Sequence, residues 1–501
     1  MGTAAADDPQ AVLQEWFGYE RFRPGQREII DAVLAGRDCI GVMPTGAGKS
    51  LTFQIPAKLL NGPVLVLSPL ISLMKDQVDA LERLGFRAAV INSTLSETDR
   101  RERLRQLRRG ELEIVYVAPE ALRQSLRSFI ADCPIRLVVV DEAHCISHWG
   151  HDFRPAYRQL HDLKAQLGDI PVLALTATAT RRVAYDIIRQ LGMRKPAGYK
   201  GSFYRPNLRI IVAKKGAGRN TRRDILSLVR GHSGESGIVY CMTRRGVDTL
   251  TDWLSEQGAK ALPYHAGLDD STRAKHQEAF ARDQADVVVA TVAFGMGIDK
   301  SNVRYVVHRD MPRSIEAWYQ EIGRAGRDGL PSDCVVFYSW ADVMGYDAFL
   351  EDMADRGLRA ETRARTLDLY RMLDRANGCR HQALVGYFDE QIEPCGEACD
   401  LCLGLQLDAL VPRQRTVRQA APAVARSSAE AEWFERLRAL RREIADKERV
   451  PPYIVFSDAV LRDMARRFPK NDRELLLIPG VGPAKLQRYG PAFLELLRDG
   501  H

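Results

Sequence analysis

The stretch Met43–Ser50, with the sequence Met-Pro-Thr-Gly-Ala-Gly-Lys-Ser, has the residue types and spacing of a phosphate-binding loop. Gly46 and Gly48 allow the backbone to curl so that its N–H groups face an anion, and a following helix adds the positive end of its dipole. Lys49 can reach the outer phosphates of a nucleotide, and Ser50 can coordinate Mg²⁺. Because the strict pattern has Gly where this chain has Met, a simple glycine-rich turn is the alternative. The predicted nucleotide contacts are Thr45, Gly46, Ala47, Gly48, Lys49 and Ser50.

Two carboxylates, Asp141 and Glu142, follow directly after the apolar run Leu137–Val140. Open α/β sheets place their ligand-binding residues at the carboxyl ends of strands, so we expect this pair beside the phosphate loop. There Asp141 can hold Mg²⁺, and Glu142 can orient and deprotonate an attacking water. Acidic residues also favour helix N-termini, so the alternative is that the pair only begins a helix.

Two arginines three positions apart, Arg324 and Arg327, lie in the glycine-rich stretch Gln320–Gly329. Their spacing predicts that both lie on one side of a helical turn. A guanidinium group is always charged and grips phosphate through two parallel hydrogen bonds. From a second α/β domain these arginines could reach a γ-phosphate, where such a group contributes about 10³–10⁵ in rate. The alternative is a solvated, basic helix end.

Four of the nine cysteines are close together in the chain, with 15, 3 and 2 residues between them. Four thiolates suit tetrahedral zinc in a closed structural site, while an iron–sulfur cluster and four free thiols are the alternatives. The predicted ligands are Cys379, Cys395, Cys399 and Cys402. The other cysteines lie beside apolar runs and are expected to be core residues in a reducing compartment. They are Cys39, Cys133, Cys145, Cys241 and Cys334.

The elements that position these residues follow from short apolar runs that alternate with amphipathic stretches between residues 25 and 340. Runs that are rich in β-branched residues and lack polar alternation predict strands buried on both faces of a parallel sheet. Strand–helix alternation over this length predicts two α/β domains, with the break near residues 197–220. The clearest runs are Val64–Leu67, Ile114–Val117, Leu137–Val140, Val172–Leu175, Ile238–Tyr240 and Val287–Val289.

The remaining third of the chain is organised differently. Residues 341–378 have a helical pattern, and residues 405–428 form a predicted flexible basic linker with Arg413, Arg415, Arg418 and Arg426. Periodicity returns at Trp433 and predicts a small all-α domain.

The composition of the 501-residue chain, 45% hydrophobic and 27% charged, is that of a soluble globular protein and suggests about three domains. It excludes disordered and collagen-like chains. The net charge of +7 permits nucleic-acid binding without requiring it. No apolar run approaches the roughly 18 residues of a membrane span, and the N-terminus lacks a signal pattern. We therefore expect a cytoplasmic protein with no membrane partner.

The chain resembles RecQ-family DNA helicases of superfamily 2 over roughly residues 10–402 and the final 70 residues. Many motifs of this family occur in the expected order, including a DEAH pattern at residues 141–144. They are Phe22–Gln26, Pro44–Ser50, Ser68–Leu73, Tyr116–Glu120, Asp141–His144, Leu175–Ala179, Tyr240–Arg245, Tyr264–Gly267, Ala290–Asp299 and Gln320–Gly329. The resemblance implies that Tyr19, Arg23 and Gln26 contact adenine and that Asp299 belongs to the ATP site. It also implies that Thr176 and Thr178 couple the ATP site to DNA.

Residues Cys145–Pro155 resemble the aromatic-rich loop that is peculiar to RecQ helicases. Bases stack on aromatic faces at about 1–3 kcal/mol each. Trp149 and Phe153 are therefore expected to stack on bases, and Arg154 to contact a phosphate. His148 stands where the family more often has Gln. The alternative is that the two aromatic residues belong to an interdomain core.

The resemblance implies an α/β fold with two RecA-like parallel-sheet domains, residues 1–200 with the ATP site and residues 201–340. A helical zinc-binding subdomain at 341–404, the linker at 405–428 and an HRDC-like helical bundle at 429–501 are expected to follow. The winged-helix domain of about 100 residues that the family usually carries has no room here. Lys485, Arg488 and Tyr489 are candidate DNA contacts of the bundle, and a protein-binding or purely structural bundle is the alternative.

The activity implied by the resemblance is that of a DNA helicase that hydrolyses Mg-ATP, moves 3′ to 5′ on single-stranded DNA and unwinds duplexes in repair and recombination. The implied cofactors are Mg²⁺ and Zn²⁺. The implied partners are ATP, single-stranded and tailed duplex DNA, and a single-strand-binding protein, for a monomer associated with the nucleoid. The alternatives are an ATP-driven translocase or annealing factor without strand separation, a non-catalytic DNA-binding scaffold and an RNA helicase.

Overall fold

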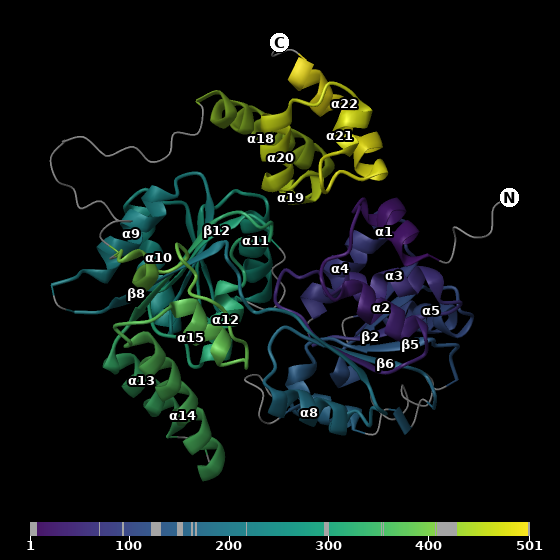
Figure 1. The fold of residues 1–501 in the computed structure, drawn as a ribbon, viewed down its shortest axis with the longest axis horizontal. Helices are drawn as coiled ribbons and strands as arrows, with labels where there is room; N and C mark the ends of the chain where they lie inside the picture. Colours follow the sequence, from purple (N-terminus) through teal and green to yellow (C-terminus); the bar gives the residue numbers. More distant parts are fainter. Residues whose placement is uncertain are drawn as a thin grey trace. The chain divides into compact units, whose positions relative to one another are not determined.

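The structure, a computed structural model, describes residues 8–498 apart from 70, 93–94, 122–131, 148–153, 162–163, 166–167, 217, 295–299, 352, 354, 406 and 408–427. The chain divides between Phe203 and Tyr204 into two compact units. Each unit contains its own parallel sheet and its own core (Figure 1).

In the first unit, the described strands form one parallel sheet with the order β3-β4-β2-β5-β6-β1-β7. Their bounds are β1 Cys39–Val42, β2 Val64–Leu67, β3 Ala88–Ile91, β4 Ile114–Val117, β5 Leu137–Val140, β6 Val172–Thr176 and β7 Ala197–Lys200. Every residue of β1 to β6 is buried, as predicted for strands covered on both faces. The helices are α1 Pro9–Phe17, α2 Gln26–Leu34, α3 Leu51–Leu59, α4 Ile71–Arg83, α5 Glu97–Arg108 and α8 Arg181–Gln190. The 3₁₀ turns η1 Pro119–Ala121, η2 Ala143–Ile146 and η3 Pro155–Leu160 complete this unit.

The described strands of the second unit form a parallel sheet with the order β10-β11-β9-β12-β13-β8. The strands are β8 Leu208–Lys214, β9 Ser236–Tyr240, β10 Ala261–Tyr264, β11 Val287–Ala290, β12 Val303–His308 and β13 Ser332–Tyr338. The helices of this α/β part are α9 Thr221–Gly231, α10 Arg244–Glu256, α11 Asp270–Ala281 and α12 Ile315–Ile322. The predicted fold class, two parallel α/β sheets, is therefore confirmed.

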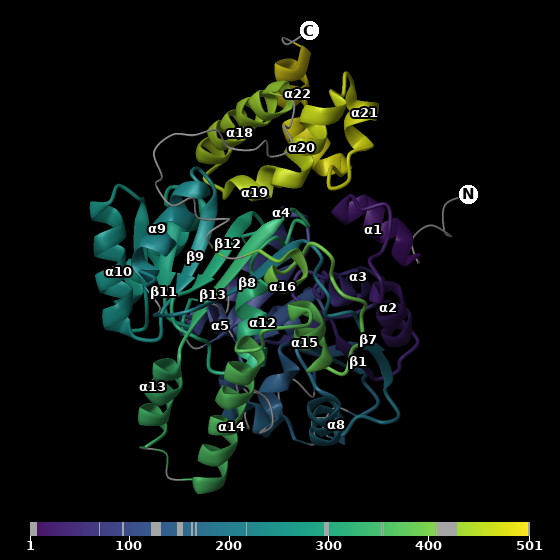
Figure 2. The ribbon, with the colours of Figure 1, turned by 60° about the vertical axis from the view of Figure 1, so that its left-hand side comes forward.

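The helical region expected after residue 340 begins with α13 Trp340–Leu350 and α14 Arg356–Leu373. The short helices α15 Arg380–Gly386 and α16 Asp400–Leu403 follow, and α16 lies beside the edge strand β8 (Figure 2). A separate core holds the C-terminal bundle together. Its helices are α18 Ser428–Glu448, α19 Pro452–Val455, α20 Asp458–Arg467, α21 Asp472–Leu476 and α22 Pro483–Arg498.

The runs predicted as strands are strands, and the five scattered cysteines are buried, as predicted for core residues. Seven of the described strands are not among the six runs named above: β1, β3, β7, β8, β10, β12 and β13. Three of the seven, β3, β7 and β10, carry a weaker signal in their sequences. β7 is a partly exposed edge strand with a glycine, β10 is only half-buried and contains Pro263, and β3 begins with two alanines. No helix among the described residues is both long and apolar enough to cross a membrane.

Candidate nucleotide and zinc sites

The predicted phosphate loop follows β1 and leads directly into α3. The backbone N–H of Met43 donates to the carbonyl of Thr176 at 2.9 Å, which fixes the start of the loop to the end of β6. Gly46 and Gly48 have φ angles of +84° and +79°, a left-handed conformation that favours glycine. The Lys49 ammonium group lies 3.4 Å from the carbonyl oxygen of Met43. The loop is therefore held as the strand–loop–helix arrangement that suits a phosphate.

Two of the residues expected to read adenine contact this loop. The side-chain amide of Gln26, a residue that is 1% exposed, donates to the carbonyls of Ala47 at 3.2 Å and Gly48 at 3.0 Å. Its amide oxygen accepts a hydrogen bond from the backbone of Arg23 at 2.8 Å, and the Arg23 guanidinium donates to the carbonyl of Gly46. The third residue, Tyr19, has an exposed ring just after α1.

The carboxylate pair lies at the end of β5, in the same unit as the phosphate loop. Burial and the neighbouring charge of Glu142 raise the pKa of Asp141 to about 7, while the charge of Lys49 acts to lower it. The charge of Lys49 therefore favours the ionised form of Asp141. Glu142 has a positive φ of +47°, a strained conformation for a non-glycine residue that often marks functional sites.

A path of polar contacts leads from Glu142 to the predicted coupling residues. The Nδ1 atom of His144 lies 3.3 Å from a carboxylate oxygen of Glu142 and 3.0 Å from the hydroxyl of Thr176. The Thr176 hydroxyl in turn donates to the carbonyl of Thr178 at 3.1 Å. Sequence reasoning assigned no role to His144, because its partner Thr176 is 32 residues away in the chain.

The aromatic-rich loop is described only at its two ends, since Trp149 and Phe153 lie outside the described residues. The backbone of Arg154 donates to the carbonyl of Cys145 at 3.0 Å, and its guanidinium donates to the carbonyl of Pro69 at 3.0 Å. Tyr157, which the sequence did not single out, donates its hydroxyl to the carbonyl of Asp141 at 2.9 Å. The two ends of the loop are thus bonded to each other, and Tyr157, just after the loop, is bonded to one residue of the carboxylate pair.

In the second unit, Arg324 and Arg327 are not on a helix, because α12 ends at Ile322 and the chain continues as turns. The prediction that both arginines lie on one side of a helical turn is therefore wrong, because neither arginine lies on a helix. Gly326, which has a φ of +55°, lets the chain turn between the two arginines. Arg324 is only 8% exposed, so it is not part of a solvated basic end. Asp299 lies outside the described residues.

The four clustered cysteines converge as predicted: their sulfur atoms all lie within 4.8 Å of one another. Cys379 caps α15 and Cys399 caps α16, each accepting a backbone hydrogen bond at 3.5 Å from a residue in its helix. Four sulfur ligands at this separation fit a tetrahedral zinc ion. The carbonyl of Ala398 accepts a hydrogen bond from Ile210 at 2.9 Å, which joins the cysteine loop to β8.

The candidate DNA contacts of the C-terminal bundle make contacts inside it. The Arg488 guanidinium lies 2.7 Å from the carboxylate of Glu448, and the Tyr489 hydroxyl donates to the same carboxylate at 3.0 Å. Tyr489 is 6% exposed, and Lys485 lies over the ring of Phe456 at 5.7 Å. These side chains therefore join α22 to the rest of the bundle, and their role in DNA binding stays a prediction.

Comparison with protein families finds four matches along the chain, in an order that corresponds to the structural regions. They are a DEAD/DEAH box helicase domain at residues 23–187, a helicase conserved C-terminal domain at 220–329, a RecQ zinc-binding domain at 340–403 and an HRDC domain at 430–497. The match at 340–403 contains all four clustered cysteines, which supports zinc as the metal.

The fold is shared with solved helicases. The helicase Lhr of Mycobacterium smegmatis, bound to single-stranded DNA and AMP-PNP, has a TM-score of 0.53 and 22% identity, and the match covers 68% of this chain and 49% of Lhr. A single-substitution variant of Dbp5 of Saccharomyces cerevisiae, bound to RNA and ADP BeF3, has a TM-score of 0.51 and 16% identity, with 65% of this chain and 88% of that chain covered. At this identity the likeness shows the fold alone.

Relatives of similar sequence cover almost the whole chain. The ATP-dependent DNA helicase RecQ of Pasteurella multocida is 37% identical, over 97% of this chain and 93% of that protein. The protein of the same name from Bacillus subtilis is 38% identical, over 97% of this chain and 98% of that protein. With these relatives, the family matches and the converging cysteines, the chain belongs to the RecQ family of ATP-dependent DNA helicases.

Proposed function

We propose that this protein hydrolyses Mg-ATP to move 3′ to 5′ along single-stranded DNA and to unwind duplexes in DNA repair and recombination. The observation that carries the proposal is the path of polar contacts from Glu142 through His144 to Thr176, an ion-pair contact followed by a hydrogen bond. This path joins the residue placed to activate water to the segment that the family uses to sense DNA. It supplies a physical route by which DNA binding alters ATP hydrolysis.

In this proposal the nucleotide is held by Lys49 and Ser50 in the phosphate loop and by Gln26 beside it. The carboxylate of Asp141 and the hydroxyl of Ser50 supply oxygen ligands of the kind that Mg²⁺ prefers, and the bound cation would stabilise the ionised form of Asp141. The Mg²⁺ ion supplies positive charge beside the phosphates.

In this proposal three side chains act on the reacting phosphate. Glu142 orients the attacking water and accepts its proton. Arg324 and Arg327, from the second unit, stabilise the negative charge that develops on the transferred phosphoryl group. We assign Asp299 to the same ATP site, and Trp149, Phe153 and Arg154 to contacts with single-stranded DNA.

The test is ATP hydrolysis with and without single-stranded DNA, together with unwinding of a 3′-tailed duplex by the same samples. We expect strong stimulation and unwinding by the wild type. Lys49→Ala and Glu142→Gln should abolish turnover but keep DNA binding, because neither residue contacts DNA in this proposal. Turnover near the wild-type rate in either variant would contradict the site assignment. Stronger stimulation by RNA than by DNA would favour an RNA helicase.

A second candidate, a translocase or annealing factor without strand separation, is favoured by one observation. The alignment with the Pasteurella relative is 593 positions long. This chain contributes 97% of its 501 residues, or about 486, to these positions. About 107 positions therefore have no residue of this chain. The RecQ zinc-binding match ends at 403 and the HRDC match begins at 430. DNA-stimulated hydrolysis without unwinding of the tailed duplex would establish this second function.

The basic linker lies mostly outside the described residues. We propose that its arginines, Arg413, Arg415, Arg418 and Arg426, provide non-specific phosphate contacts. Deletion of residues 405–428 should then weaken DNA binding at low salt, and an unchanged affinity would contradict the idea.

We also propose that the protein is monomeric, nucleoid-associated and assisted by a single-strand-binding protein. Light scattering and a pull-down with that protein would test these points.

A further inference from the structure

Helix α18 of the HRDC bundle carries three arginines, Arg438, Arg441 and Arg442, which we call the arginine ridge. Their spacing places them on one face of the helix. Within the second unit this face meets the α/β part of the chain. Arg438 donates to the carbonyl of Gly234, Arg442 donates to the carbonyl of Asp283 at 3.3 Å, and Arg441 lies 3.9 Å from the Asp283 carboxylate.

The groups of the α/β part that contact the arginine ridge lie just beyond the ends of two helices. Gly234 follows α9, which ends at Gly231, and Asp283 follows α11, which ends at Ala281. The last carbonyls of a helix lack partners within it, and the negative end of its dipole attracts cations. Asp283 adopts a left-handed conformation with a φ of +57°, as is common at the residue that ends a helix. The ridge therefore meets a surface of opposite charge.

A buried network of four charges lies at the centre of this contact. Arg441, which is fully buried, bonds to Asp458 of its own bundle at 2.7 Å, and Asp283 pairs with the buried Lys300. Burial would raise the pKa of Asp283, but the charges of Lys300 and Arg441 hold it at about 2. Two cations and two anions balance one another, and loss of one partner would leave an uncompensated buried charge.

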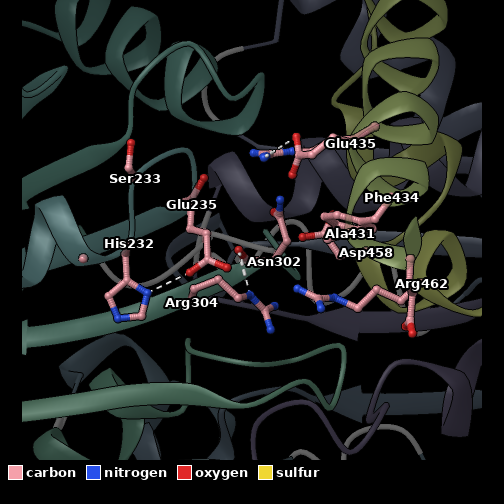
Figure 3. A pocket seen from close by; sticks show the side chains of 14 residues that line it. His232, Ser233, Glu235, Asn302, Arg304, Ala431, Phe434, Glu435, Asp458 and Arg462 are labelled. Atoms are coloured by element: carbon pink, nitrogen blue, oxygen red, sulfur yellow. Dashed lines mark hydrogen bonds and ion pairs between the residues drawn. The ribbon is translucent and has the colours of Figure 1, made fainter. Parts of the chain in front are cut away.

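A polar cavity of about 280 Å³ lies beside the network. His232, Glu235 and Arg304 line it from the α/β part, and Phe434 and Arg462 line it from the bundle (Figure 3). Arg438 also lines it. Burial acts to raise the pKa of Glu235, but the hydrogen bond and charge of His232 and, to a smaller extent, the charges of Arg304 and Arg462 lower it. A contact with so many charged and so few apolar groups resembles the interfaces between domains that move relative to one another.

We propose that the HRDC bundle docks reversibly on the second motor domain through the arginine ridge, and that nucleic-acid phosphates compete for the same arginines. Arginine is the residue best suited to grip phosphate, and its donors here are engaged by backbone carbonyls and Asp283. DNA that binds the ridge must therefore displace the motor domain from it. In the docked state the motor domain covers the arginine ridge, and the ridge becomes accessible when DNA displaces that domain.

Hydrogen–deuterium exchange on the full-length protein tests the docking. In the charge-reversal variant Arg438→Glu/Arg442→Glu we expect residues 232–236 and 282–286 to exchange at least about tenfold faster than in the wild type. Arg438→Lys/Arg442→Lys should retain much of the protection, because the charge remains. Arg436→Glu is the matched control, since Arg436 is exposed on the same helix and lies over the ring of Trp433. Continued slow exchange in α20 and α22 would show that the bundle of each variant is folded.

Exchange measured at raised salt and in the presence of DNA tests the docking and the competition with DNA separately. Raising NaCl from about 0.1 M to about 1 M shortens the Debye length from about 10 Å to about 3 Å and should speed exchange at the same two segments. Oligo(dT) should have the same effect at low salt in the wild type. Unchanged exchange in the charge-reversal variant would overturn the docking. Faster exchange in that variant but no response to oligo(dT) would overturn the competition with DNA.

Discussion

The side-chain amide of Gln26 donates a hydrogen bond to the carbonyl of Gly48 at 3.0 Å, so a residue expected to read the base is attached to the loop expected to hold the phosphates. A Cβ atom on Gly48 would lie 2.5 Å from the amide nitrogen of Gln26, so a side chain at this position would displace the Gln26 amide from the loop. In the proposed nucleotide site, recognition of adenine and the shape of the phosphate loop are thus coupled through one side chain.

The first prediction concerns this coupling. Gln26→Ala removes hydrogen bonds to two carbonyls of the loop, each with a net value of about 1 kcal/mol. We expect the KM for ATP to rise about tenfold, which corresponds to about 1.4 kcal/mol. Steady-state hydrolysis at varied ATP and GTP measures the effect, and the preference for ATP over GTP should fall.

The control for this variant is Gln190→Ala. Gln190 bonds to Asp186 at 3.3 Å on α8, in the same unit but outside the phosphate loop. Its removal should leave the KM unchanged. A Gln26→Ala enzyme with the wild-type KM and nucleotide preference would show that the loop keeps its shape without this side chain.

Local sequence signals predicted the parts of the site that depend on neighbours in the chain. The phosphate loop, the carboxylates after β5 and the cysteine cluster each carry residue types at fixed spacing. The bonds of His144 to Thr176 and of Tyr157 to Asp141 could not be predicted, because they depend on how separate strands and turns meet in space. The spacing of three residues between Arg324 and Arg327 suits a helix and a turn alike, so it could not predict that α12 ends before them.

A second prediction follows from Tyr240, at the end of β9. Its hydroxyl donates to the carbonyl of Phe294 at 2.8 Å, and its ring stacks on His308 with centroids 5.3 Å apart. Burial raises the pKa of Tyr240 to about 12, against the opposing effect of the nearby Arg324. Tyr240 thus contacts the segment that precedes Asp299 and lies near a predicted catalytic arginine.

Tyr240→Phe keeps the stacked ring but leaves the Phe294 carbonyl without its donor, at a cost of about 1–3 kcal/mol. We expect the DNA-stimulated kcat to fall about tenfold while the KM for ATP changes little. Tyr305→Phe is the matched control, because the buried Tyr305 hydroxyl has no hydrogen-bond partner among the described residues. Equal losses of kcat in both variants would mean that the effect is general to buried tyrosines of this sheet.

The third prediction concerns zinc. Cys395→Ser removes one of the four sulfur ligands, and zinc binding in small modules provides about 10–16 kcal/mol of apparent stability. We expect a large loss of bound zinc and lower solubility. We also expect faster exchange of amides in β8, because Ala398 in the cysteine loop bonds to Ile210. Cys133→Ala, at a buried cysteine outside the cluster, should keep full zinc content. Full zinc and wild-type stability in Cys395→Ser would count against the site.

The fourth prediction concerns pH. His232 lies 2.7 Å from the carboxylate of Glu235 and 3.1 Å from that of Asp333, and joins the end of α9 to β13. Burial acts to lower the pKa of His232, but the hydrogen bonds and charges of Asp333 and Glu235 outweigh it and raise the pKa to about 9. The folded protein thus binds this proton more tightly than the unfolded chain does. The stabilisation is fully present below about pH 6.5 and is lost as the pH rises through about 9.

His232→Gln should therefore lower the free energy of unfolding most below about pH 6.5, by on the order of 3 kcal/mol. The difference from the wild type should shrink as the pH rises through about 9. Urea titrations at a series of pH values measure it. His276→Gln is the control, because His276 bonds to the carbonyl of Pro263 at 2.8 Å rather than to a carboxylate. The difference in the free energy of unfolding between His232→Gln and the wild type depends on pH only if the charged form of His232 is what stabilises the fold. A difference that stays constant with pH would show that the ring contributes by packing instead.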